Sequence, residues 1–219
     1  MNKHSIESIM VSTSPQKKPR TAAPEVRRKQ LIEATITCIA RKGISGTTLN
    51  AIAKEAGLSL GLANFHFKSK DALLSETLRH LAAEHRDMWL RDAQRGDLSD
   101  AEKLRSIVSS QFHPRICSQK KLAVWFAFFG EANHRKAYRL ISSQIDMERQ
   151  DLCTELFGNI ISEGEYVDTD ADQVAQTLEG LFDGLWLNML MYPAKFRRDI
   201  AERQVIDYLR LVFPRHFCI

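Results

Sequence analysis

Apolar residues recur at helical spacing over most of the chain and predict an all-α protein. A first helix is expected to begin near Pro24 or Glu25, because proline suits the first turn and an acidic residue suits its positive end. It is expected to end at Gly43. Further helices are expected at 69–94, 100–112, 118–130, 134–163, 170–191 and 197–212, with breaks at Pro114, Gly130, 164–168 and Pro193. No stretch alternates like a strand.

Two short helices are predicted between Thr48 and Phe67. The first has an apolar face made of Leu49, Ile52, Ala53 and Ala56. Thr48 can cap the start of this helix, and Ser59 can cap the start of the second one. Gly57 favours the left-handed backbone conformation in which many helices end. Two short helices joined by a glycine-containing turn form a helix-turn-helix.

This stretch resembles the DNA-binding domain of TetR-family repressors. The matching positions are Thr48, Ile52-Ala53, Ala56 to Ser59, Gly61, His66-Phe67 and Lys70 to Leu74. One position departs from the family pattern, which usually has tyrosine near position 64, where this chain has Asn64. The resemblance implies an N-terminal three-helix DNA-binding domain, with base contacts that are this chain's own.

In a helix-turn-helix the second helix enters the major groove, and residues near its start contact bases. The candidates are Ser59, Leu60, Gly61, Leu62 and Asn64. Asn64 is the strongest, because asparagine pairs bidentately with adenine, while Leu60 could pack on a thymine methyl. Contacts to the DNA backbone are expected from Thr48, His66, Lys70, Arg27 and Arg28. Core packing is the alternative for Phe65 and Phe67, and it is favoured for Phe67.

The charge of the chain is uneven. Residues 1–75 hold 12 Lys and Arg against 5 Asp and Glu, whereas residues 76–219 hold 19 against 22. A basic N-terminal third followed by a near-neutral remainder is typical of a nucleic-acid-binding domain joined to a domain with another role. Residues 1–24 are rich in Ser, Thr, Pro and Lys, which predicts a disordered basic arm. Lys17, Lys18 and Arg20 could contact phosphate or a minor groove, or belong to a solvated tail.

Composition also limits where the protein works. The longest apolar run, 122–129, is far shorter than the roughly 20 residues that a membrane helix needs, and no secretory signal precedes the first helix. The four cysteines, at 38, 117, 153 and 218, are scattered and include no C-x-x-C pair. We therefore expect a cytoplasmic protein with reduced thiols and no membrane partner.

Two segments of the body carry candidate chemistry. Within 118–130, Trp125 and Phe129 share one helical face. Within 178–191, Gly180 and Gly184 lie one turn apart, and Asp183, Trp186 and Leu187 are expected on a different face. An acid in an apolar helix is costly unless it is paired or solvated, so Asp183 is expected at a pocket, at an interface or beside a base.

These segments add a narrower resemblance, to the Bet-type TetR repressors that control glycine betaine synthesis from choline. It is carried by A-V-W-F-A-F-F (123–129), H-R-K-A-Y-R-L (134–140) and L-F-D-G-L-W-L (181–187), and with the head it spans about 25 to 213. It implies a homodimeric repressor that responds to choline or a similar small molecule. Trp125, Phe129 and Trp186 could then bind a quaternary ammonium by cation–π attraction, with Asp183 as counter-charge. Plain core packing is the favoured alternative for the same aromatic residues, because apolar helical faces are usually buried.

The last two helices, 170–191 and 197–212, are the expected dimer surface, since two from each subunit make a four-helix bundle. Gly180 and Gly184 would permit a close crossing, and Tyr208 and Leu209 belong to the apolar face of the last helix. A two-fold dimer places two heads about 34–36 Å apart on the DNA and predicts a palindromic operator.

Other classes of function find less support. His80 and Glu84 share a face near His85, but they offer too few ligands for a metal. No nucleophile with a base and no glycine-rich phosphate loop occurs, so neither a catalytic role nor a cofactor is expected. A helical adaptor that forms a heteromer remains an alternative, as does a TetR-type regulator of another pathway. The expected domains are the arm at 1–24, the helix-turn-helix domain at 25–75, and a helical ligand-binding and dimerisation domain at 76–219.

Overall fold

The computed structural model describes residues 23–133 and 135–218, and within these ranges it is all-helical. The helices are α1 (Pro24–Lys42), α2 (Leu49–Glu55), α3 (Leu60–His66), α4 (Lys70–Ala93), α5 (Asp100–Gln111), α6 (Gln119–Glu131), α7 (Lys136–Gly164), α8 (Ala171–Met191) and α9 (Arg198–Val212). The all-α prediction is confirmed. The arm predicted for 1–24 lies, up to residue 22, outside the described residues.

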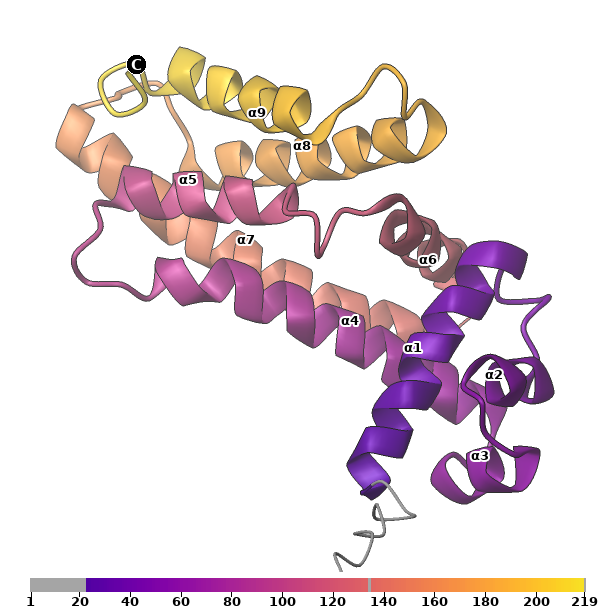
Figure 1. The fold of residues 1–219 in the computed structure, drawn as a ribbon. Coiled ribbons are helices and arrows are strands. Elements are labelled where there is room, and N and C mark those ends of the chain that lie inside the picture. The colour runs from indigo at the N-terminus through magenta and orange to yellow at the C-terminus, as the bar shows by residue number, and fades with distance from the viewer. Residues whose placement is uncertain (1–22, 134, 219) are drawn as a thin grey trace, which may run out of the picture.

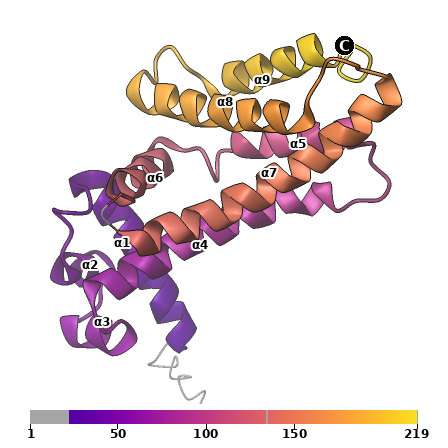
Figure 2. The same cartoon turned by 180° about the vertical axis from the view of Figure 1, so that it is seen from behind.

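The helices form a small head and a larger body (Figure 1). Helices α1 to α3 make the head at one end, and the long helix α4 runs from it into the body. Helix α7 lies along α4, while α8 and α9 form the outer layer on the far side of α5, as the reverse view in Figure 2 also shows. No helix of the described residues is long and apolar enough to span a membrane.

The short helices of the head begin and end where the sequence predicts. The hydroxyl oxygens of Thr48, Ser59 and Ser69 accept hydrogen bonds from backbone N–H groups three residues on, at 3.1, 3.2 and 3.1 Å. These bonds satisfy donors that a helix start otherwise leaves without a partner. Gly43 and Gly57 end their helices at φ of +68° and +66°, where glycine is favoured. The predicted helix-turn-helix is therefore confirmed in its local geometry.

The predicted break at Gly130 is confirmed to within one residue. Helix α6 ends at Glu131, and α7 begins at Lys136. Helix ends commonly differ by one or two residues from a sequence-based boundary.

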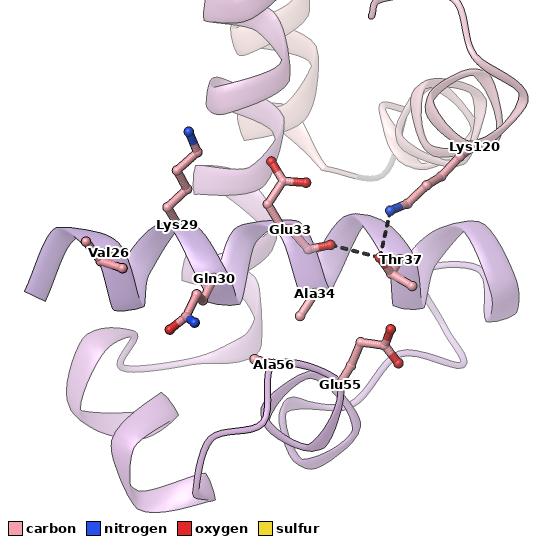
Figure 3. Close-up of a pocket in the computed structure, with 9 residues that line it drawn as sticks. All are labelled: Val26, Lys29, Gln30, Glu33, Ala34, Thr37, Glu55, Ala56 and Lys120. Carbon is pink, nitrogen blue, oxygen red and sulfur yellow. Dashed lines mark hydrogen bonds between the residues drawn. The ribbon is translucent and has the colours of Figure 1, made fainter. Parts of the chain in front are cut away.

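The head and the body meet where α1 lies against α6. Figure 3 shows Lys120 reaching from α6 to Thr37 on α1, where its Nζ donates a hydrogen bond of 2.7 Å to the threonine Oγ1. A groove beside this contact is lined by side chains of α1, α2 and α6. It contains no aromatic ring, so it does not provide the aromatic site that the sequence predicts. Arg135 makes a second link, with its Nη1 2.8 Å from Asp71 at the start of α4.

Candidate functional site

Helix α3 presents one face of the head to solvent. Ala63 is fully buried and fixes the helix against the head, while Gly61 and Asn64 are exposed and Leu60 is 43% exposed. Phe65 is 78% exposed, so the core-packing alternative is wrong for this residue, whereas Phe67 is buried as expected. The predicted base-contacting residues thus lie on an open surface.

Two basic residues near α3 hold the head together. Arg28 donates from Nη1 to the carbonyl oxygen of His66 at 3.0 Å, and its guanidinium lies 4.4 Å from the centre of the Phe67 ring. Lys70 donates from Nζ to the carbonyl oxygen of Ile44 at 2.8 Å. Both side chains are therefore turned onto the protein, and a phosphate contact by Arg28 would require it to leave these partners. Arg27 lies one residue earlier on α1 and remains a candidate for phosphate contact.

The body contains a small cavity lined by five aromatic rings. Trp125 and Phe129 come from α6, Phe182 and Trp186 from α8, and His85 from α4. The Trp125 ring centre is 5.8 Å from that of Phe129 and 6.4 Å from that of Trp186, and His85 lies 5.5 Å from Trp186. The structure thus brings together the three aromatic residues that the sequence singled out, and it adds His85.

Acidic groups surround one buried arginine at the same cavity. Arg149 on α7 donates from Nε to Glu179 at 2.9 Å and from Nη2 to Asp146 at 3.2 Å. Burial, together with the nearby carboxylate of Glu179, raises the pKa of Asp146. Asp183 lines the cavity and is exposed at its outer edge; burial, and then the charges of Asp146 and Glu179, raise its carboxyl pKa. Asp146 and Asp183 thus line the cavity beside the guanidinium of Arg149, which Glu179 pairs with from outside the lining.

His85 contributes a neutral ring. Burial lowers its pKa to about 3, and the positive charge of Arg149 acts in the same direction. Its Nε2 lies 2.9 Å from the Oε1 of Gln111, so the neutral ring donates this hydrogen bond. The indole N–H of Trp186 donates to the backbone carbonyl of Gln111 at 3.0 Å. Gln111 thereby fixes two of the five rings.

The cavity is closed as it stands. The space between its rings and acids admits about one water molecule. A larger molecule can enter only if the α6 and α8 rings move apart.

Five residues that line the cavity were not predicted from the sequence as part of this site. They are His85, Gln111, Asp146, Arg149 and Phe182. One signal was present: His85 lies four residues after Leu81, in line with the apolar stripe of α4. No signal within α7 shows that Arg149 is buried, because its main partner, Glu179, comes from α8.

The expected dimer surface stays a prediction, but burial within the chain limits which of its residues a partner could contact. Gly180 and Gly184 face open space on α8. Leu187 is 44% exposed on the same side of α8 as the two glycines, whereas Trp186 is buried. The prediction that Leu187 and Trp186 share a face is therefore wrong. Leu209 is fully buried inside its own chain and is not available to a partner, and Tyr208 is half-buried. The exposed apolar residues of α9 are instead Ile200 and Leu211.

Comparison with known proteins agrees with this architecture. Residues 31–77 match the bacterial regulatory proteins of the tetR family, and residues 100–214 match the C-terminal domain of BetI-type transcriptional repressors. The chain belongs to the TetR family of transcriptional regulators. Its helix-turn-helix head and helical body are those of this family, whose members bind DNA operators and small effectors and act as dimers.

Two relatives are named HTH-type transcriptional regulator BetI. The protein from Paraburkholderia phymatum is 33% identical over 202 residues, covering 90% of this chain and 98% of the relative. That from Burkholderia thailandensis is 33% identical over 203 residues, covering 90% and 99%. The predicted Bet-type resemblance is confirmed, and these relatives of the TetR family are regulators, not enzymes.

Solved structures share the fold. A transcriptional regulator from Pseudomonas aeruginosa has a TM-score of 0.78 at 26% identity, covering 90% of this chain and 94% of its own. A regulator from Saccharomonospora viridis, solved in complex with choline, has a TM-score of 0.73 at 22% identity, covering 85% and 96%. At this identity, the similarity to the Saccharomonospora viridis protein extends only to the fold.

Proposed function

We propose that this repressor controls genes that convert choline to glycine betaine, and that choline or a close analogue releases it from a palindromic operator. The observation that carries the proposal is the cavity in which Trp125, Phe129 and Trp186 meet Asp183. The names of the BetI relatives support the pathway, and the choline complex of the Saccharomonospora viridis protein supports a ligand of this kind. A repressor of chromosomal genes acts in the cytoplasm.

The chemistry of the cavity suits a quaternary ammonium. Such a group has no N–H to donate, so it is held by the faces of aromatic rings and by nearby negative charge. The ring centres of Phe129 and Trp186 lie 5.8 and 6.4 Å from that of Trp125, so the three rings could surround one cation once the cavity widens. With Asp146, Asp183 and Glu179 ionised against Arg149, the site carries an excess of negative charge.

The position of α6 suggests how binding reaches the head. The helix carries Trp125 and Phe129 on the cavity side, and Lys120 at its start contacts Thr37 on α1 (Figure 3). The next residue, Lys121, pairs with Glu84 on α4. Because the cavity is closed, a ligand must displace α6 or α8 to enter, and a displaced α6 moves the contacts to α1 and α4. The ligand need only prefer the arrangement in which the two heads no longer match the operator.

The deciding experiment is fluorescence-anisotropy binding of the dimer to its own upstream DNA, with and without choline, at fixed salt. We expect tight binding to a palindrome in that DNA that weakens when choline is added. Tight binding that choline leaves unchanged would retain the repressor and reject the effector, which then belongs to another pathway. No preference over random DNA would reject operator control and favour the adaptor.

Replacing Trp125 by leucine is expected to weaken choline binding by about 10- to 30-fold, because a desolvated cation–π contact contributes about 2 kcal/mol. Calorimetric titration measures the change. The matched control is Phe128→Leu, on the same helix, whose fully buried ring packs against Tyr138 at 5.1 Å and does not line the cavity. Both variants lose core packing, but only the first should lose affinity. Unchanged affinity in Trp125→Leu would make this tryptophan plain core.

Replacing Asp183 by asparagine is expected to raise stability while lowering choline affinity by up to about 5-fold. The fold raises the pKa of this carboxyl, so the ionised form opposes folding above that pKa, and stability recovers as pH falls through it. The variant should therefore melt higher than the parent at pH 8, with the difference shrinking on acidification. Thermal melts from pH 3 to 8 test this, with Asp151→Asn, at an exposed position of α7, as control. A lower melting temperature at pH 8 would contradict the expectation.

A further inference from the structure

Arg149 has one guanidinium nitrogen that the protein does not use. Its Nε and Nη2 donate to Glu179 and Asp146, whereas Nη1 is buried and has no hydrogen-bond partner among the described residues. The side chain is only 5% exposed, and it is part of the cavity lining together with the aromatic rings and Asp183. Buried polar groups in folded proteins almost always have a partner. The N–H groups of Nη1 can therefore donate to an acceptor from outside the chain.

We propose that Arg149 Nη1 binds an oxygen of the effector, so that the effector is a quaternary ammonium with an uncharged oxygen acceptor. This inference rests on the proposed function and adds the second half of the ligand to it. The aromatic rings hold the cationic end, and the guanidinium holds a hydroxyl or carbonyl oxygen. Choline and betaine aldehyde both have this chemistry.

The charges around Arg149 explain why the oxygen should be uncharged. Glu179 takes two of its nitrogens, so the positive charge of the guanidinium is already balanced. Asp146 and Asp183, where they are ionised, then give the cavity an excess of negative charge. A carboxylate on the ligand would approach these acids and be repelled. A zwitterion such as glycine betaine thus fits the rings but not the arginine end.

The first test compares three ligands on the unmodified full-length protein by calorimetric titration. They are choline, tetramethylammonium, which lacks the oxygen, and glycine betaine, which carries a carboxylate. We expect choline to bind at least about 10-fold more tightly than either, as the hydrogen bond of a charged donor predicts. Equal affinities for choline and tetramethylammonium would mean that water alone occupies Nη1 and would overturn this inference while leaving the aromatic cage intact. Tighter binding of glycine betaine than of choline would also overturn this inference.

Failure of the proposed function looks different. If a protein that binds its operator binds none of the three ligands, both the effector class and this inference are rejected.

The second test changes the arginine. Arg149→Lys keeps a positive charge beside Glu179 but removes the planar group that carries Nη1. We expect its choline affinity to fall to that of tetramethylammonium, while tetramethylammonium binding stays the same. Arg86→Lys is the matched control, because Arg86 pairs with Glu148 between α4 and α7 and does not line the cavity. An equal loss for both ligands in Arg149→Lys alone would make Arg149 a structural residue and overturn the proposal. If this variant does not fold, the three-ligand comparison still decides.

Discussion

Replacing Asn64 by alanine is expected to weaken operator binding by about 30-fold to about 10⁴-fold. Asn64 is exposed on α3, beside Gly61 and Leu60, on the face that can enter a major groove. A bidentate pair between asparagine and adenine contributes about 1–3 kcal/mol of discrimination, and a dimer makes the contact once in each half-site. The variant therefore loses this binding free energy once in each half-site. This makes the effect one of the two largest that we expect.

The specificity of the loss distinguishes base contact from general weakening. Anisotropy titrations of Asn64→Ala should show equal affinity for the operator and for a version with one adenine–thymine pair changed in each half-site. Arg27→Ala is the control, because a phosphate contact should weaken binding to all DNA alike and reduce its salt dependence. If Asn64→Ala keeps the full preference of the parent for the unchanged operator, base recognition belongs to other residues of α3, with exposed Phe65 the next to test.

The head could be predicted almost completely from its sequence, because its signals are local. Thr48, Ser59 and Ser69 each bond to a backbone N–H three residues away, and Gly57 adopts the left-handed conformation that glycine favours. Such interactions depend on a few neighbouring residues, so a short sequence contains all the information. The inward turn of Arg28 was not predictable in this way, because its partner, the carbonyl of His66, lies 38 residues along the chain.

The cavity could be predicted only in part. Trp125, Phe129 and Trp186 stand out as large aromatic residues in apolar helices, and Asp183 as an acid among them, so each drew notice by itself. Arg149 did not, because an arginine with Asp146 one turn earlier resembles a common surface pair on α7. Its burial depends on Glu179, which α8 supplies from 30 residues away. Packing between distant helices, not local pattern, creates the site.

The dimer surface shows the same limit. Helical spacing reveals that α9 has an apolar face but does not say whether its own chain or a partner covers it. Leu209 is covered by its own chain, whereas Leu211, two residues later, is 83% exposed. On α8 the open face contains Gly180, Gly184 and Leu187. The revised surface yields a second prediction of large effect.

Replacing Leu187 by aspartate is expected to convert the dimer to a monomer and to weaken operator binding by about 10²- to 10⁴-fold. We propose that two copies of α8 cross at this face, so the aspartate would bury a charge there, beside the glycines that permit a close approach. A monomer still recognises one half-site, but it loses the gain that comes from linking two heads on one palindrome. Analytical ultracentrifugation measures the first effect and anisotropy the second.

Leu140→Asp is the matched control. Leu140 is a leucine of similar exposure, at 56% against 44% for Leu187, but it lies on α7, outside the surface of α8 and α9. It should remain a dimer with parental affinity for the operator. Circular dichroism should show unchanged helicity in both variants, because neither side chain is part of the core. A dimeric Leu187→Asp with full affinity would place the interface elsewhere. A monomer with full affinity would mean that a single head suffices, and the palindrome would then lose its physical basis.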